Sequence, residues 1–228
     1  MFSNHRPIIM SAPMVRALLD GRKTQTRRLA LTACKSCAGS GPRQAGIPCR
    51  TCDGRGERPT VWQKAHPGDR LWVRETWRLK HFGPNITLAY ALKRCDEQGI
   101  PKEIVYEADD PGGIGSYRNN RPSIHMPRWA SRLTLVVTEV RRQRLQEISA
   151  DDCLAEGIED SGPDMGVYRQ HRGHNPEAAR RYATGLRKRY AALWTSLHGA
   201  GAWDENPEVV ALTFTVHLAN IDRLEEAA

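Results

Sequence analysis

The chain has 228 residues, of which 39% are hydrophobic and 26% are charged. This length suits one domain with insertions, and the composition excludes a chain that is disordered throughout. The net charge of +8, from 34 Lys and Arg against 26 Asp and Glu, is typical of proteins that meet RNA or DNA. A basic surface that only favours solubility would carry the same charge. The basic residues gather around 22–28, 141–144 and 180–189, and most of them are Arg, which binds phosphate well.

No stretch of the sequence approaches the ~18 consecutive apolar residues of a membrane-spanning helix. The first residues contain no apolar run long enough for a signal peptide. We therefore expect a cytoplasmic protein that does not contact membranes. In that reducing compartment the six cysteines are not expected to form disulfides, so paired cysteines indicate a metal site. Cys95 and Cys153 stand alone and are expected to be ordinary thiols.

The chain begins with the pattern of a strand, a helix and a second strand. Residues 6–10 predict a short strand. Ser11 follows as a candidate helix N-cap, with Pro13 in the first turn and Gly21 just past the helix end. Residues 24–31 alternate β-branched and polar side chains, which predicts another strand before the segment 33–59 interrupts the pattern.

The rest of the chain continues as a mixture of strands and helices. Further strands are predicted over 70–77, 86–92, 103–107, 131–145 and 208–218, and a long Gly- and Pro-rich surface loop over 109–127. Ser149 opens a capping box, which predicts a short helix ending at Gly157, and Asn175 opens a longer helix to His198. An apolar stripe at helical spacing predicts the buried face of that helix: Tyr182, Leu186, Tyr190, Leu193 and Leu197. The order predicts an α+β domain built around a small β-barrel and flanked by helices.

The segment 33–59 contains two CxxCxGxG units, one with Cys34 and Cys37 and one with Cys49 and Cys52. Two residues between paired thiols allow both sulfurs to face one tetrahedral ion, and the glycines allow the chain to turn tightly. Four thiolates fill the coordination sphere, so we predict a structural zinc ion with no position for a catalytic water. Two unpaired thiols or a redox CxxC are the alternatives. The units are similar to the zinc repeats of the cysteine-rich region of the DnaJ chaperone, and basic neighbours make contact with nucleic acid a further possibility.

The segment 21–28, GRKTQTRR, is the second informative motif. Lys23 and Thr26 lie three residues apart, where a predicted helix gives way to a strand. A Lys becomes a base only if burial or neighbouring cations lower its pKa, and the arginines around it would supply the second effect. Such a Lys would activate the Thr hydroxyl. Arg22 and Arg27 are candidates for binding the substrate. In the alternative interpretation the loop is a solvated basic surface or only binds phosphate.

The order of motifs resembles the ASCH superfamily, PUA-like β-barrels associated with RNA, and is most similar to its prophage-encoded branch. The likeness extends over 6–218, with the zinc segment and the Gly-rich loop as insertions, and rests on GRKTQTRR, PGDRLWVRETW, VTEVRRQRLQEIS and DDCLAEGI. In small bacterial ASCH enzymes that hydrolyse the acetyl group of N4-acetylcytidine, a KTxT-type motif supplies a Lys and a Thr, and a Glu follows the long strand. The resemblance implies that Lys23 is the base, that Thr26 is the nucleophile, and that Glu156 handles the proton of the leaving amine.

Two further segments are candidates for lining the same pocket. The first contains Arg74, Glu75 and Trp77, and the second contains His125, Arg128 and Trp129. Either Trp could stack on a base, and Arg128 could hold a phosphate. In the alternative interpretation these are aromatic residues at the core edge with solvated charges, and Glu156 is a surface carboxylate at a helix end.

The sequence therefore predicts an amidohydrolase that acts on an N4-acylated cytosine in a nucleoside or RNA. A non-catalytic RNA- or DNA-binding PUA-like module and an ASCH-type ribonuclease stay open as alternatives. The zinc segment begins shortly after Thr26, so we expect it beside the mouth of the pocket.

Overall fold

A computed structural model describes residues 4–44, 47–82, 86–109, 120–161, 165–166, 170–171 and 173–226. By their internal contacts the residues divide into two units. Unit 1 comprises Met1–Lys23, Gly68–Val137 and Phe214–Ala228. Unit 2 comprises Thr24–Pro67 and Thr138–Thr213.

The largest sheet has five strands in the order β1-β7-β10-β11-β2. Their bounds are His5–Ile9 for β1, Gln25–Leu29 for β2, Arg70–Arg74 for β7, Thr134–Arg144 for β10 and Glu208–His217 for β11. Strand β7 is parallel to β1 and antiparallel to β10, and β11 is antiparallel to β2. The sequence predicted all five strands, and the α+β class is confirmed. The part of the chain that the structure describes forms no closed barrel, so a PUA-like barrel stays a prediction.

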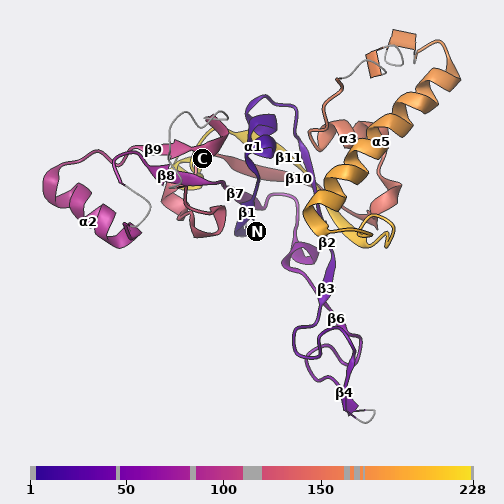
Figure 1. The fold of residues 1–228 in the computed structure, drawn as a ribbon, viewed down its shortest axis with the longest axis horizontal. Helices are drawn as coiled ribbons and strands as arrows, with labels where there is room; N and C mark the ends of the chain where they lie inside the picture. The colour runs from indigo at the N-terminus through magenta and orange to yellow at the C-terminus, as the bar shows by residue number, and fades with distance from the viewer. Residues whose placement is uncertain are drawn as a thin grey trace. The chain divides into compact units, whose positions relative to one another are not determined.

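Unit 1 adds short elements around β1 and β7 (Figure 1). Its helices are α1 Ala12–Leu19, α2 Leu88–Gln98 and α6 Ile221–Glu226, and β8 Trp77–Leu79 pairs with β9 Ile104–Tyr106. Short 3₁₀ helices span Glu107–Asp109, Ser123–His125 and Arg128–Ala130. One hydrophobic core of this unit contains Trp77, Leu79, Ala91, Met126 and Ala130. Of the predicted loop 109–127, residues 110–119 lie outside the described part, and Arg121 forms a bridge with Trp77.

The predicted strand at 86–92 is wrong, because this segment begins helix α2. The Thr87 side chain accepts a hydrogen bond from the backbone N–H of Tyr90, as a helix N-cap does. Ala91 and Cys95, four residues apart, are the buried residues of the helix, and Gly99 ends it in the left-handed conformation with φ of 64°. The capping role of Thr87 was not among the predictions, and its branched side chain is also compatible with a strand.

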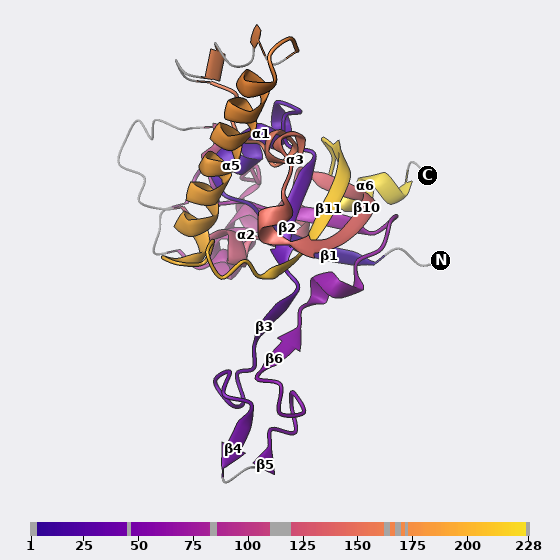
Figure 2. The same ribbon diagram turned by 90° about the vertical axis from the view of Figure 1, so that its right-hand side faces the viewer.

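Unit 2 contains β2, the cysteine segment and two helices (Figure 2). Strand β3 Leu31–Ala33 pairs with β6 Glu57–Pro59, and β4 Pro42–Gln44 pairs with β5 Ile47–Pro48. The helices are α3 Ala150–Ala155 and α5 Pro176–His198, and short 3₁₀ helices span Val61–Lys64 and Leu145–Glu147. The β3–β6 pair joins the two ends of the cysteine segment, so the predicted insertion begins and ends as a two-stranded ribbon within unit 2.

Helices α3 and α5 lie side by side, and both begin at the predicted caps (Figure 1). The Ser149 side chain accepts from the backbone N–H of Asp152 at 3.0 Å, and the Asn175 side chain accepts from that of Glu177 at 2.9 Å. The buried stripe of α5 is confirmed up to Tyr190, but Leu197 is 60% exposed. Steps of four residues from Tyr182 lead to the buried Trp194 instead, which the sequence-based stripe missed.

Candidate functional site

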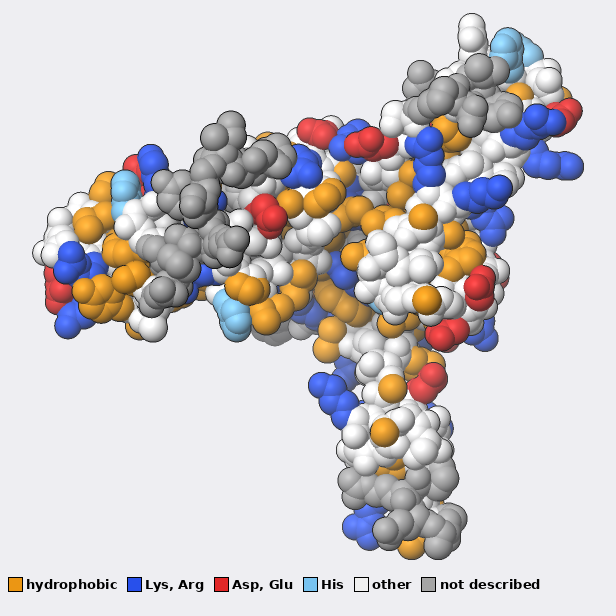
Figure 3. Space-filling model, viewed as in Figure 1, with side chains coloured by type: hydrophobic (Ala, Val, Ile, Leu, Met, Phe, Trp, Pro, Cys, Tyr) orange, Lys and Arg blue, Asp and Glu red, His pale blue; other side chains and the backbone are white. Residues whose placement is uncertain are grey.

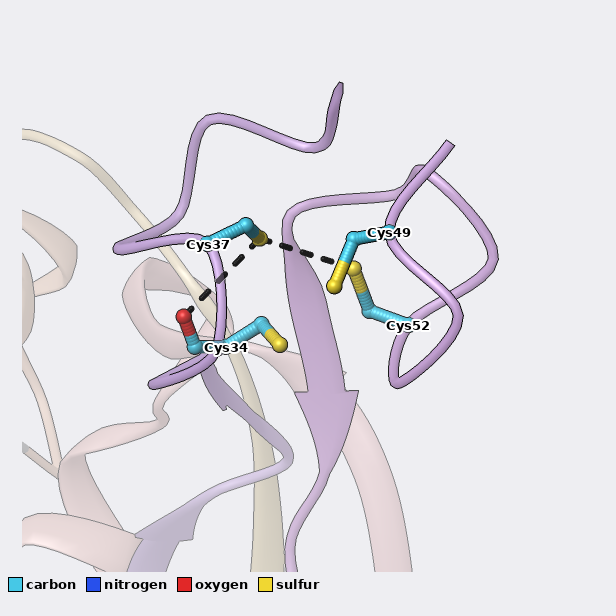
Figure 4. Close-up of side chains that lie close together, drawn as sticks. All are labelled: Cys34, Cys37, Cys49 and Cys52. Carbon is cyan, nitrogen blue, oxygen red and sulfur yellow. Dashed lines mark hydrogen bonds between the residues drawn. The ribbon is translucent and has the colours of Figure 1, made fainter. Parts of the chain in front are cut away.

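Four cysteine thiols lie together between two loops of unit 2 (Figure 4). The Sγ atoms of Cys34, Cys37, Cys49 and Cys52 all lie within 4.8 Å of one another. Those of Cys37 and Cys52 are 3.7 Å apart. Four sulfurs at about 2.3 Å from a tetrahedral zinc ion would be separated by about 3.8 Å. The cluster could therefore hold a metal ion, and its spacing is compatible with zinc.

The glycines of the two CxxCxGxG units make this cluster possible. Gly39, Gly41, Gly54 and Gly56 all have positive φ, between 76° and 83°. A Cβ on Gly41 would lie 2.3 Å from the carbonyl oxygen of Gly54, and a Cβ on Gly56 would lie 2.2 Å from that of Gly39. Both distances are far below van der Waals contact. The two units therefore approach each other through matched, reciprocal contacts that exclude any side chain at Gly41 or Gly56.

Backbone N–H groups favour the thiolate form at part of the cluster. The backbone N–H of Thr51 is the main cause that lowers the pKa of Cys49 to about 6. Burial raises the pKa of Cys52 to about 11. A metal ion would deprotonate all four thiols, because only thiolates are ligands. Metal binding is therefore expected to release protons and to weaken in acid.

A second group of polar side chains lies at β2 and α3 in unit 2. The Arg27 side chain is 0% exposed, and it donates to Asp152 Oδ2 at 2.9 Å and to Glu156 Oε1 at 3.1 Å. Arg141 donates to Asp152 Oδ1 at 2.7 Å, and the Gln25 side-chain carbonyl accepts from Arg27. Buried charges that are paired and hydrogen-bonded hold one another in fixed orientations. The cluster therefore fixes both carboxylates against β2.

The arginines of this cluster lower the pKa of the Asp152 carboxyl. Burial alone would raise the pKa of its carboxyl, but the hydrogen bond from Arg141 and the charge of Arg27 lower that pKa to about 2. A carboxyl whose pKa is lowered by folding stabilises the protein above its unfolded pKa of about 3.9, and this contribution is lost as the pH falls through the folded pKa.

Replacing Asp152 with Asn is therefore expected to cost the most stability near pH 7 and progressively less between about pH 4 and pH 2. Urea unfolding at a series of pH values measures the difference from wild type. Asp151→Asn is the matched control, because Asp151 is exposed in the same helical turn. A difference that stays constant down to pH 2, or that the control reproduces, would contradict the ionic role of Asp152.

The three residues predicted as catalytic are all buried. Lys23 is 1% exposed, and Thr26 and Glu156 are each 4% exposed. The alternative interpretation of Glu156 as a surface carboxylate is therefore wrong. The backbone N–H of Thr24 donates to the carbonyl oxygen of Ala155 at 2.8 Å, which joins the approach to β2 to the end of α3 within unit 2. Lys23 belongs to unit 1, so its place beside the other two side chains stays a prediction.

The arginines predicted to bind substrate in the same segment have carboxylate partners. Arg22 donates to Asp20 Oδ2 at 2.9 Å on the surface. Arg27 is enclosed and is shared between Asp152 and Glu156. The structure thus shows Arg27 as the residue that orders the carboxylates, and direct contact of either arginine with substrate stays a prediction.

The candidates on β7 and β8 lie in unit 1. Glu75 is 1% exposed, and both of its carboxylate oxygens accept from Arg132 at 2.9 Å. Burial raises the pKa of Glu75 in spite of this partner. The Arg74 side chain donates to the carbonyl oxygen of Met126 at 3.0 Å. Trp77 is 0% exposed and forms part of the core, so it lies deeper than the core-edge position of the alternative interpretation.

Of the candidates at 125–129, one lies at a pocket of about 410 Å³ in unit 1. Trp129 lines it and is 43% exposed, and its ring packs edge-on against Trp77 with centroids 6.1 Å apart. Arg128 donates to Asp222 Oδ1 at 2.8 Å through Nε, so its guanidinium already has a carboxylate partner. His125 is exposed. Among these candidates, Trp129 is therefore the aromatic face best placed to meet a base.

Sequence reasoning missed two members of this polar cluster, Asp152 and the half-buried Arg141. Asp152 was assigned only to the capping box, yet it lies four residues before Glu156 and so on the same side of α3. Gln25 and Arg27 share one side of β2 because strand side chains alternate. The four-residue spacing in α3 and the two-residue spacing in β2 were thus present in the sequence, but only the fold shows that β2 and α3 meet.

Within the described residues, no helix has the length and apolarity needed to cross a membrane. Comparisons with protein-family models, with curated proteins and with solved structures found no match to this chain, so its likeness to the ASCH superfamily stays a prediction from the motifs.

Proposed function

We propose that this protein is a cytoplasmic, ASCH-like amidohydrolase with a PUA-like core and a structural zinc site, and that it removes the acyl group from an N4-acylated cytosine in a nucleoside or RNA. Thr26 is the nucleophile, Lys23 is its base, and Glu156 transfers a proton to the leaving amine. The observation that carries the proposal is the buried, arginine-held carboxylate of Glu156, on a helix whose end is hydrogen-bonded to the residue between Lys23 and β2.

The order of bond changes follows from these roles. Lys23 takes the proton of Thr26 Oγ, and Oγ forms a bond to the acyl carbon of the amide. The proton then passes from Lys23 to the Glu156 carboxylate and on to the exocyclic nitrogen as the C–N bond breaks, which releases cytosine and leaves an acyl ester on Thr26. Water then attacks this ester and releases the carboxylic acid. Arg27 holds the Glu156 carboxylate in place and does not itself react.

The four cysteines serve the fold of their segment. Cys34, Cys37, Cys49 and Cys52 would hold a zinc ion with four thiolates, which stabilises the tight glycine turns and leaves no ligand position for water or substrate. The hydrolytic step is therefore assigned entirely to side chains outside this segment.

Acetate release from N4-acetylcytidine tests the assignment. Thr26→Ala is expected to lower the rate to the uncatalysed background, because no other group replaces the attacking oxygen. Thr24→Ala is the matched control, since Thr24 is exposed two residues away, and it is expected to keep most of the activity.

Equal rates in wild type and Thr26→Ala would exclude Thr26 as the nucleophile. No acetate release by any form would exclude the hydrolase and favour the second candidate, an RNA- or DNA-binding module. The concentration of basic side chains on α5 is the observation that supports this second candidate.

A further inference from the structure

Helix α5 carries a large share of the charge of the protein. It contains five Arg or Lys residues and one Glu, so its side chains contribute +4 of the formal net charge of +8. The helix has 23 of the 228 residues. Figure 3 shows Lys and Arg side chains gathered over this helix. The positive charge is therefore concentrated rather than spread evenly along the chain.

The packing of α5 fixes which side faces solvent. Its buried residues recur every four positions: Ala178, Tyr182, Leu186, Tyr190 and Trp194. With 3.6 residues per turn, Arg180 and Lys188 fall opposite this buried row, Arg181 and Arg187 fall at its two flanks, and all four are exposed. We call these four residues the basic face of α5. Because the apolar face is anchored in the core, the basic face is held at a fixed orientation on a rigid element.

The extent of ion pairing differs from residue to residue along this face. Arg181 pairs with Glu177 on the surface, where both side chains are more than half exposed, and such a pair is weak in water. Arg187 donates to the carbonyl oxygen of Gln146, which leaves its charge in place. Within the described residues, neither Arg180 nor Lys188 has a carboxylate within ion-pair distance. Within the described part of the chain, Arg180 and Lys188 therefore keep their charge for an external anion.

We propose that the basic face of α5 binds the phosphodiester backbone of a nucleic acid. The proposal rests on the proposed function, since it supplies the surface that would hold an RNA substrate beyond the reacting base. Arg180 and Lys188 are eight residues apart, a rise of about 12 Å along the helix, over which one strand of a duplex advances by three to four nucleotides at about 3.4 Å each. The face thus spans several consecutive phosphates, which it would bind without reading base sequence.

Fluorescence anisotropy with a labelled single-stranded RNA and with a duplex DNA, each over a range of salt concentrations, tests this proposal. The test variant is Arg180→Gln with Lys188→Gln, which keeps helix-forming side chains and removes two charges. The control is Lys93→Gln with Lys102→Gln, which removes two exposed charges from unit 1. The test variant is expected to bind RNA about tenfold more weakly at low salt, and the slope of log affinity against log salt is expected to fall by about 1.4.

Equal affinities and slopes in wild type and test variant, or the same loss in the control, would overturn the proposal. Binding of wild type to anionic phospholipid vesicles but not to RNA or DNA would overturn it in favour of a membrane surface. Acetate release from free N4-acetylcytidine is expected to be unchanged in the test variant, because a nucleoside has no phosphodiester. The two proposals therefore fail separately: loss of this surface leaves nucleoside turnover intact, and absence of turnover leaves phosphate binding measurable.

Discussion

Replacing Cys37 and Cys52 together with serine is expected to abolish zinc binding and to unfold the segment that holds the four cysteines. Serine hydroxyls are not thiolates, and the two remaining sulfurs cannot fill a tetrahedral site. The free energy at stake is about 10–16 kcal/mol for structural zinc sites near neutral pH, which exceeds what a short segment with little hydrophobic core gains from packing. Metal analysis of the purified protein and hydrogen exchange over this segment measure the two effects.

The rest of unit 2 is expected to keep its structure in this variant, because its hydrophobic core is built mainly on α5 and includes none of the four cysteines. Cys95→Ser is the control for loss of a buried thiol, since Cys95 lies in α2, away from the cluster in the chain. A double variant that still binds one zinc ion, or that shows unchanged exchange in the cysteine segment, would contradict a four-thiolate site.

Replacing Arg27 with Met is expected to destabilise the protein by about 3–5 kcal/mol, the typical effect of leaving a buried charge without its partner. Met has a similar length and no charge, so the change leaves Asp152 and Glu156 buried without the guanidinium that joins them. Arg141 would still pair with Asp152, whereas Glu156 would lose the ion pair that Arg27 makes with its Oε1 atom. Urea unfolding monitored by circular dichroism measures the loss.

Arg142→Met is the matched control, because Arg142 is an exposed arginine of β10 with a hydrogen bond to a carbonyl oxygen. Its effect is expected to stay within about 0.5 kcal/mol, as for most surface substitutions. Equal stabilities of the Arg27→Met and Arg142→Met variants would show that the cluster does not depend on the charge of Arg27. The argument that Arg27 fixes the Glu156 carboxylate would then be wrong.

Local signals in the sequence predicted much of the fold. Some patterns involve only neighbouring residues and can be recognised from the sequence alone. They include the caps at Ser149 and Asn175, the alternation of side chains in β10 and the spacing of the CxxCxGxG units. The failures come from signals with two meanings. Thr87 is a good strand former and a good helix cap, and only the burial of Ala91 and Cys95 decides for the helix.

The candidate site was less predictable because its contacts join residues far apart in the chain. Arg27 and Glu156 are separated by 129 positions, and neither motif contains the other. The charge of Arg27 suggested a phosphate ligand, whereas the fold encloses it completely between two carboxylates. The cysteine cluster was predictable because its two halves repeat the same short unit. The glycines of each unit permit the tight turns that bring the thiols together.

Acid-quenched mass spectrometry of the protein during turnover of N4-acetylcytidine tests the central claim most directly. We predict a fraction of chains heavier by one acetyl group, with the modification mapped to Thr26 and absent from Thr26→Ala. Acetate release by wild type together with undiminished release by Thr26→Ala, or an acetyl group on any other residue, would contradict the account.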